Sequence, residues 1–335
     1  MKVGVLQFFS WPERRVPLPV VYERALARID VMDRTGYDAV WLAEHHFSTY
    51  SVCPSVHLMG MHVAARTTQL RVGTAVTLAA FHHPLRIAEE VAMLDVLSGG
   101  RVNWGAGRGF DRTEYAAFDV ADDESYPLFR ENVAVVLDAW RHERLSFEGR
   151  FHRFEGVEVL PKPVQQPHPP TWLAASSPEA VEWSASQGHS ILMDPHASHS
   201  EIARKRALWQ STLEAAGFSS AGRDIPMARL VAVAPTTAEA EEVARRGASW
   251  MIGSYANPAK RAVVRGDVTE AGRPGAQADP VQRYVDDVIV WGTPTSVVDQ
   301  LGELAETMPL DYLLAAPLSH QSFELLTDEV LPKVA

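Results

Sequence analysis

The sequence contains a single cysteine, Cys53, among 335 residues. One thiol cannot form a disulfide within the chain, so we expect a protein of the reducing cytoplasm and not a disulfide-stapled secreted domain. Free cysteines are usually buried and unreactive, and the same is expected of Cys53.

Long apolar runs are also missing. None approaches the ~20 residues that span a membrane, and the N-terminal stretch MKVGVLQFF predicts a strand rather than a signal peptide. Positive charge is scarce, because 31 Lys and Arg face 42 Asp and Glu, for a net charge of −11. This balance argues against a nucleic-acid or anionic-membrane partner. An anionic ligand would need a local binding site.

The chain does contain a regular alternation of β-rich runs and amphipathic helices. The predicted strands cover residues 2–8, 38–43, 70–77, 102–105, 171–175, 191–193, 227–234 and 312–316. Strands that alternate with helices in this way predict an α/β fold, a single (β/α)₈ TIM barrel over residues 1–335. An open doubly wound sheet is disfavoured because no G-x-G-x-x-G motif follows the first strand.

Two segments are additional to this alternation. Residues 147–160, FEGRFHRFEGVEVL, predict a surface hairpin. Residues 253–287 are rich in Gly, Pro and charge, and so long a connection in a compact domain is usually functional or mobile. Near the seventh strand of a barrel it would lie on the catalytic face, which makes it a candidate mobile lid, with a disordered surface insertion as the alternative.

Glu44, His45 and His46 follow the second predicted strand, and the C-terminal ends of barrel strands face the active site. Side chains alternate along a strand, so one histidine should enter the barrel mouth, where it can act as a general base or hydrogen-bond donor. A metal site made of His45, Glu44 and either His82 or His83 is a weaker alternative, because adjacent histidines on a strand diverge.

Two further strand ends predict a phosphate site. In GAGRGF, the glycines (Gly105, Gly107 and Gly109) allow close backbone approach to a ligand, and Arg108 offers a bidentate donor. In ASSPEA, Ser176 and Ser177 precede a helix N-terminus, which favours anions. The alternatives are that Ser177 only caps its helix and that Arg108 pairs with Glu114.

The segments VWLAEHHF, VGTAVTLAAFHHPLRIAEEVAMLDVLSGGRVNWGAGRGF and VWGTPTSVVDQL resemble the bacterial luciferase family of flavin-dependent monooxygenases. The similarity is collinear from Met1 to about Val330. It implies a (β/α)₈ barrel that uses reduced FMN and O₂ to oxygenate a small organic substrate through a peroxyflavin. It also implies a separate flavin reductase that delivers the reduced FMN.

The resemblance assigns roles to individual residues. His45 matches the catalytic histidine beside the flavin ring, and Glu44 lies against the same site. The other implied cofactor contacts are the non-proline cis peptide Ala75-Val76, the phosphate-binding Arg108 and Ser177 with Ser176 beside them, Phe110 near the ring, and the loop glycines Gly107 and Gly109. No metal is implied.

Three positions depart from the luciferase pattern. Gly107 replaces a reactive cysteine, Ser176 replaces a glutamate and Asp119 replaces a glycine. These differences argue against light emission and a long-chain aldehyde substrate, but not against flavin binding, and the substrate is not predicted. A deazaflavin-dependent hydride transferase, a non-catalytic flavin-binding protein and a metal-dependent hydrolase are the alternative functions.

The predicted helix at residues 54–67 is apolar on nearly all sides. Helices of a barrel normally show one polar face, so this composition predicts a subunit interface. The resemblance likewise implies a homodimer.

Overall fold

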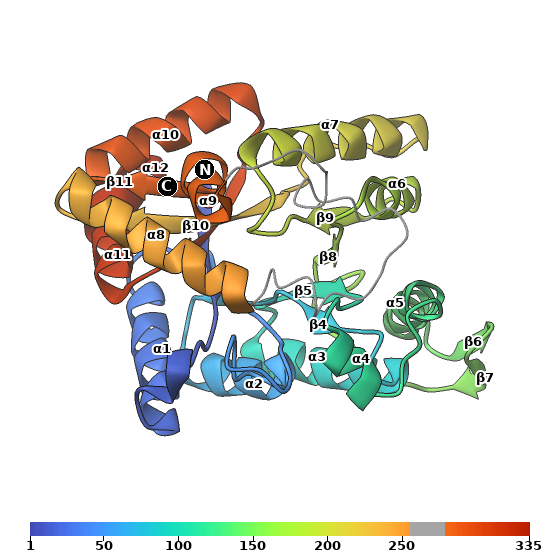
Figure 1. Cartoon of the computed structure of the whole chain (residues 1–335). Helices are drawn as coiled ribbons and strands as arrows, with labels where there is room; N and C mark the ends of the chain where they lie inside the picture. The colour runs from blue at the N-terminus through green and yellow to red at the C-terminus, as the bar shows by residue number, and fades with distance from the viewer. Residues whose placement is uncertain (255–278) are drawn as a thin grey trace.

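The computed structural model describes residues 1–254 and 279–335. They form a curled, TIM-barrel-like sheet of parallel strands that is surrounded by helices (Figure 1). The strands follow the order β11-β10-β12-β1-β2-β3-β5-β8-β9, and β4 pairs with β5 beside this path. Their bounds are β1 Lys2–Gln7, β2 Ala39–Leu42, β3 Arg71–Thr74, β4 Thr77–Leu78, β5 Val102–Gly107, β8 Thr171–Ala174, β9 Ser190–Leu192, β10 Pro226–Val233, β11 Ile289–Gly292 and β12 Tyr312–Pro317.

Helices connect successive strands and cover the outside of the sheet. The longer ones are α1 Leu18–Met32, α2 Val56–Arg66, α3 Pro84–Ser98, α5 Ser125–Arg141, α6 Pro178–Ser186, α7 His199–Ala215, α8 Thr237–Ser254 and α10 Pro294–Thr307. The shorter ones are the 3₁₀ turn η1 Pro12–Arg14, α4 Arg112–Ala117, α9 Pro280–Asp287, α11 His320–Leu325, the π-helical η4 Leu326–Val330 and α12 Leu331–Val334. Hydroxyl side chains cap several of their N-termini, as they do in most proteins.

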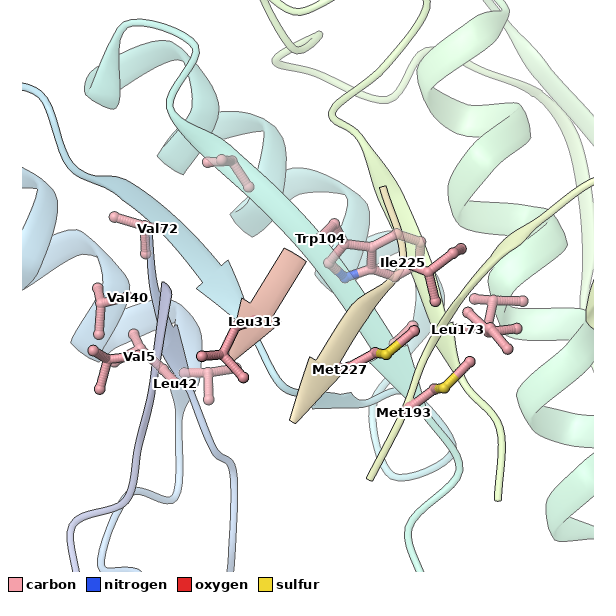
Figure 2. Packing of buried hydrophobic residues seen from close by; sticks show 14 of the residues in the cluster. Val5, Val40, Leu42, Val72, Trp104, Leu173, Met193, Ile225, Met227 and Leu313 are labelled. Atoms are coloured by element: carbon pink, nitrogen blue, oxygen red, sulfur yellow. The ribbon is translucent and has the colours of Figure 1, made fainter. Parts of the chain in front are cut away.

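The sheet curls until β9 meets β10 through one isolated bridge between Met193 and Met227, whose side chains lie near each other in Figure 2. Beyond that bridge, the same edge of β10 pairs with β11, from Leu230 opposite Ile289 onward. Neither β11 nor α10 was predicted from the sequence. Strand β11 has only four residues, and so short a run gives little periodicity.

Large aromatic rings fill the centre of the sheet because glycines leave them room. The Trp41 indole meets Trp172 and Tyr312 edge-on and donates a hydrogen bond to the Tyr312 hydroxyl at 3.0 Å. A Cβ at Gly73 would come within 2.4 Å of Trp41. The opposite face of each strand packs against the helices with residues such as Val40 and Leu42 (Figure 2).

Of the two segments additional to the strand–helix alternation, the structure describes one fully and the other in part. Strands β6 Leu145–Glu148 and β7 Arg153–Val157 form an antiparallel pair that projects beyond α5 in Figure 1, at the segment where a hairpin is expected. Most of the predicted lid falls on residues 255–278, which lie outside the described residues. The last part of that range is α9, whose Tyr284 and Val285 are buried. In the described part of the chain, each helix is too short or too polar to cross a membrane.

Candidate active site

Four neighbouring strand ends bring the predicted site residues to one rim of the sheet. Strands β2, β3, β5 and β8 are parallel and adjacent, with Leu42 opposite Thr74 and Ala106 opposite Leu173. The residues that follow these strands therefore emerge side by side. They include Glu44, the Ala75-Val76 peptide, the loop around Arg108, and Ser177.

Glu44 is buried at this rim and both of its carboxylate oxygens are used. Oε1 accepts hydrogen bonds from His46 Nε2 at 3.0 Å and His82 Nε2 at 2.7 Å, and Oε2 accepts from the Leu78 amide at 3.2 Å. Burial alone would raise the pKa of Glu44, but the two imidazoles lower it to about 2. The same contact raises the pKa of His82 against the opposing effect of its burial. Glu44 thus ties the end of β2 to the loop after β4.

His45 and His46 point to different surroundings, as expected from strand alternation. His46 joins Glu44, whereas the His45 ring packs edge-on against Tyr50 at 4.8 Å and Phe110 at 6.1 Å. The side chain of His45 is 12% exposed. The metal alternative that used His45 is therefore wrong in its choice of histidine, because His46 is the one that faces Glu44 and His82.

A second buried carboxylate, Glu114, approaches His45 from α4. Its Oε1 lies 3.8 Å from His45 Nδ1 and accepts a hydrogen bond from the His46 amide at 2.8 Å. Its Oε2 has no hydrogen-bond partner among the described residues. A buried carboxylate with one unsatisfied oxygen is costly, so a polar partner for that oxygen would be favoured.

Arg108 is buried, and within the described ranges it makes no ion pair. Its Nη1 donates to Ser125 Oγ at 2.9 Å, and its guanidinium lies 4.2 Å from the Tyr126 ring centroid. The alternative pairing with Glu114 is not present, because that carboxylate faces His45 and His46. The start of α5 therefore holds Arg108 in place without neutralising its charge.

Ser177 is buried and caps α6, and its Oγ accepts a hydrogen bond from the Ala180 amide at 3.3 Å. The neighbouring Ser176 is exposed. Arg130 on α5 bonds Glu179 in the first turn of α6 at 3.3 Å and also approaches the Tyr126 ring. Arg108 and the α6 N-terminus thus contact the same face of α5.

The backbone between these groups is closely packed. The Ala75-Val76 peptide is cis. A Cβ at Gly107 would lie 2.4 Å from Val76 Cγ2, so the cysteine that luciferases carry there would not fit without a shift. Gly109 has φ +86°, and Asp119 also lies in the left-handed region, at φ +55°. The glycine that Asp119 replaces is therefore the residue this conformation favours.

Several residues of the site were not found from the sequence. Ser125 and Tyr126 carry no motif that links them to Arg108. Asp111 and Glu114 have the spacing of a helix capping box, which conceals the contact of Glu114 with His45. Cys53 is buried, which raises its pKa to about 12. The thiol therefore stays protonated and unreactive at neutral pH.

The fold and the site residues agree with a match to a known protein family. Residues 1–310 match the model of the luciferase-like monooxygenases, and the chain belongs to that family. It is similar to the oxygenase component of a flavin-dependent trigonelline monooxygenase from Acinetobacter baylyi, with 29% identity over 197 residues, 58% of this chain and 54% of the relative. It is also similar to protein y4wF of Sinorhizobium fredii, with 40% identity over 170 residues, 51% of this chain and 50% of the relative.

Among solved structures, the monooxygenase RslO1 from Streptomyces bottropensis is similar over 100% of both chains, with a TM-score of 0.86 and 27% identity. The chain spans about half the length of the curated relatives named above.

Proposed function

We propose that this protein is the oxygenase component of a two-component monooxygenase. It would take reduced FMN from a separate flavin reductase and use O₂ to oxygenate a small organic substrate. The observation that carries the proposal is Arg108, a buried guanidinium that no described carboxylate neutralises, in a chain of net charge −11. An uncompensated buried cation is costly, and a phosphate dianion is suited to its planar donors.

The residues around Arg108 fit the phosphate end of FMN. Ser177 accepts from Ala180 through its oxygen, which leaves its hydroxyl proton for a phosphate oxygen. The N-terminus of α6 adds a favourable dipole. Gly107 has no side chain, which lets Val76 of the cis Ala75-Val76 peptide pack directly against the end of β5 and holds that peptide in place at the site. Bound FMN would supply the redox chemistry that activates O₂.

His45 is the residue we assign to proton transfer. Glu114 Oε1 lies 3.8 Å from His45 Nδ1 and so faces that edge of the imidazole. Nε2 then hydrogen-bonds or exchanges a proton with the reacting groups. Tyr50 and Phe110 restrict rotation of the imidazole, which fixes its direction. Aromatic walls also exclude water from the reaction.

The proposal is tested with His45→Ala. We expect FMN affinity to change by less than a few-fold, whereas substrate oxygenation falls about 10²- to 10⁴-fold, the usual contribution of a general acid or base. The measurements are an FMN titration, and oxygen uptake with product and H₂O₂ analysis across aldehydes, ketones, sulfonates and polyketides.

His83→Ala is the matched control, because His83 is exposed and its described ring contacts are with His152 and Phe154. This variant should oxygenate as the wild type does. Unchanged turnover in His45→Ala would overturn the role of His45. Turnover without O₂ on a reduced deazaflavin would overturn the monooxygenase assignment itself.

We also propose a homodimer that packs through α2 and α3. These adjacent helices expose large apolar side chains: Leu58 is 76% exposed, Leu97 65%, Met93 46% and Val96 40%. Val56 and Val63 on α2 face the core instead. The helix is therefore apolar both where it packs on the core and where it meets solvent. Several large apolar side chains exposed on neighbouring helices are typical of a protein interface.

A further inference from the structure

We propose that Glu44, His46 and His82 form a binding site for a divalent transition-metal ion of the Zn²⁺ class. The site has one ligand atom from each residue, and these atoms all lie within 4.8 Å of one another. Two imidazoles and one carboxylate are a common ligand set for Zn²⁺ and its neighbours in the first transition row. The site differs from the histidine set expected from the sequence, because it excludes His45.

The carboxylate is prepared for a cation before any ion arrives. Glu44 is a buried carboxylate, and its Oε1 already accepts hydrogen bonds from the Nε2 atoms of His46 at 3.0 Å and His82 at 2.7 Å. The Leu78 amide holds Oε2, which directs Oε1 toward both Nε2 atoms. An outer hydrogen bond of this kind orients a metal ligand.

A metal ion would replace the two hydrogen bonds that now end on Oε1. Each imidazole must then present the lone pair of Nε2, so its remaining proton moves to Nδ1. His46 and His82 each keep one proton in this exchange, and no oxidant or reductant is required. A metal ion between the three atoms would compensate for the two hydrogen bonds with three coordination bonds.

The route to the site passes His82, whose side chain is 34% exposed, whereas those of Glu44 and His46 are 2% and 8% exposed. The Phe118 ring packs edge-on against His46 at 4.8 Å and closes the other side. Three protein ligands leave at least one coordination position open. A water molecule or another small ligand would fill that position.

Binding of the ion should also inhibit turnover, a consequence that rests on the proposed function. Glu44 directly precedes His45, and its other oxygen holds the loop after the Ala75-Val76 peptide. Repositioning Glu44 toward an ion would displace both parts of the flavin site. The binding itself does not depend on any flavin chemistry.

The test uses the full chain, treated with EDTA, dialysed and free of flavin. Co²⁺ is titrated and its visible absorption recorded, and Zn²⁺ is titrated in a calorimeter. We expect one ion per chain, with the Co²⁺ band of a nitrogen- and oxygen-ligated site that EDTA abolishes. His46→Gln and His82→Gln should each weaken binding by about 100-fold or more, the upper end of the loss seen even for outer-shell changes.

His83→Gln is the matched control, because it removes the exposed neighbour of His82, and it should bind within two-fold of the wild type. Circular dichroism shows whether His46→Gln is folded, and His82→Gln, at a half-exposed position, gives the same test without a core change. No cobalt band, or equal binding by all variants, would overturn the site. The titration contains no flavin, so a failure of the proposed function would leave its result unchanged.

Discussion

The two halves of the candidate site treat buried charge in opposite ways. On the β2 side, both carboxylate oxygens of Glu44 accept hydrogen bonds, from His46, His82 and Leu78, so its charge is satisfied within the protein. On the α6 side, Arg108 has a serine and two tyrosine rings as described partners, and no carboxylate. A charge that the fold satisfies stabilises the fold even without a ligand, whereas a charge held in place without a counterion indicates a ligand.

Removing the satisfied charge should have the largest effect on stability. Glu44→Gln keeps the shape of the side chain but loses the ionic part of its bonds to two imidazoles. The lowering of the Glu44 pKa from 4.5 to about 2 corresponds to a loss of at most about 3 kcal/mol in the free energy of unfolding at pH 7. Urea unfolding at several pH values measures this loss.

The contribution of Glu44 to the free energy of unfolding should depend on pH with a definite sign. Because the folded-state pKa lies below the unfolded value, ionised Glu44 stabilises the fold above pH 4.5, and this contribution disappears as the pH falls toward 2. The difference between wild type and Glu44→Gln should therefore shrink over that range. Glu89→Gln, an exposed change on α3, should show no such difference. A gap between wild type and Glu44→Gln that stays constant with pH would contradict the assignment.

Removing the unsatisfied charge should instead affect ligand binding. Arg108→Gln is expected to weaken FMN affinity by about 100-fold, as for the loss of a charge-assisted bidentate contact. Riboflavin, which lacks the phosphate, should bind wild type and variant alike. Folding stability should change little or increase, because the variant no longer buries an uncompensated cation. Titrations with both flavins measure the difference.

Arg130→Gln is the control for Arg108, because Arg130 also approaches Tyr126 but pairs with Glu179. It should alter FMN affinity by less than a few-fold. If Arg108→Gln weakened riboflavin and FMN equally, Arg108 would not be the phosphate ligand, and the contrast between the two halves would fail.

The contrast also shows what the sequence could predict. Periodicity located most strands, and their parallel order then placed Glu44, Arg108 and Ser177 on one rim, because the ends of parallel strands emerge together. Alternation along the chain after β2 predicted that His45 and His46 diverge. Which of them meets Glu44 depends on the loops after β4 and β5, whose path has no sequence periodicity.

Contacts between distant segments were beyond prediction for the same reason. Glu114 reaches His45 across 69 positions in the chain, and the local spacing of Glu114 predicts a helix cap instead. Strand β11 was missed because its pairing with β10 is tertiary and its own four residues carry little signal. Local patterns determine elements, whereas the partners of buried charges are set by packing.

The smallest expected effect on folding concerns a surface outside both halves. Leu58→Glu places a charge on the exposed apolar face of α2, where it should change the free energy of unfolding of one chain by about 0.5 kcal/mol or less. In the proposed homodimer the same charge would be buried without a partner, so the dimer should dissociate. Sedimentation equilibrium at low micromolar concentration separates the two states. Phe218→Glu, at a position that is 41% exposed and packs against Gly188 after α6, should remain as dimeric as the wild type. A wild-type chain that sediments as a monomer would show that these apolar side chains serve another purpose.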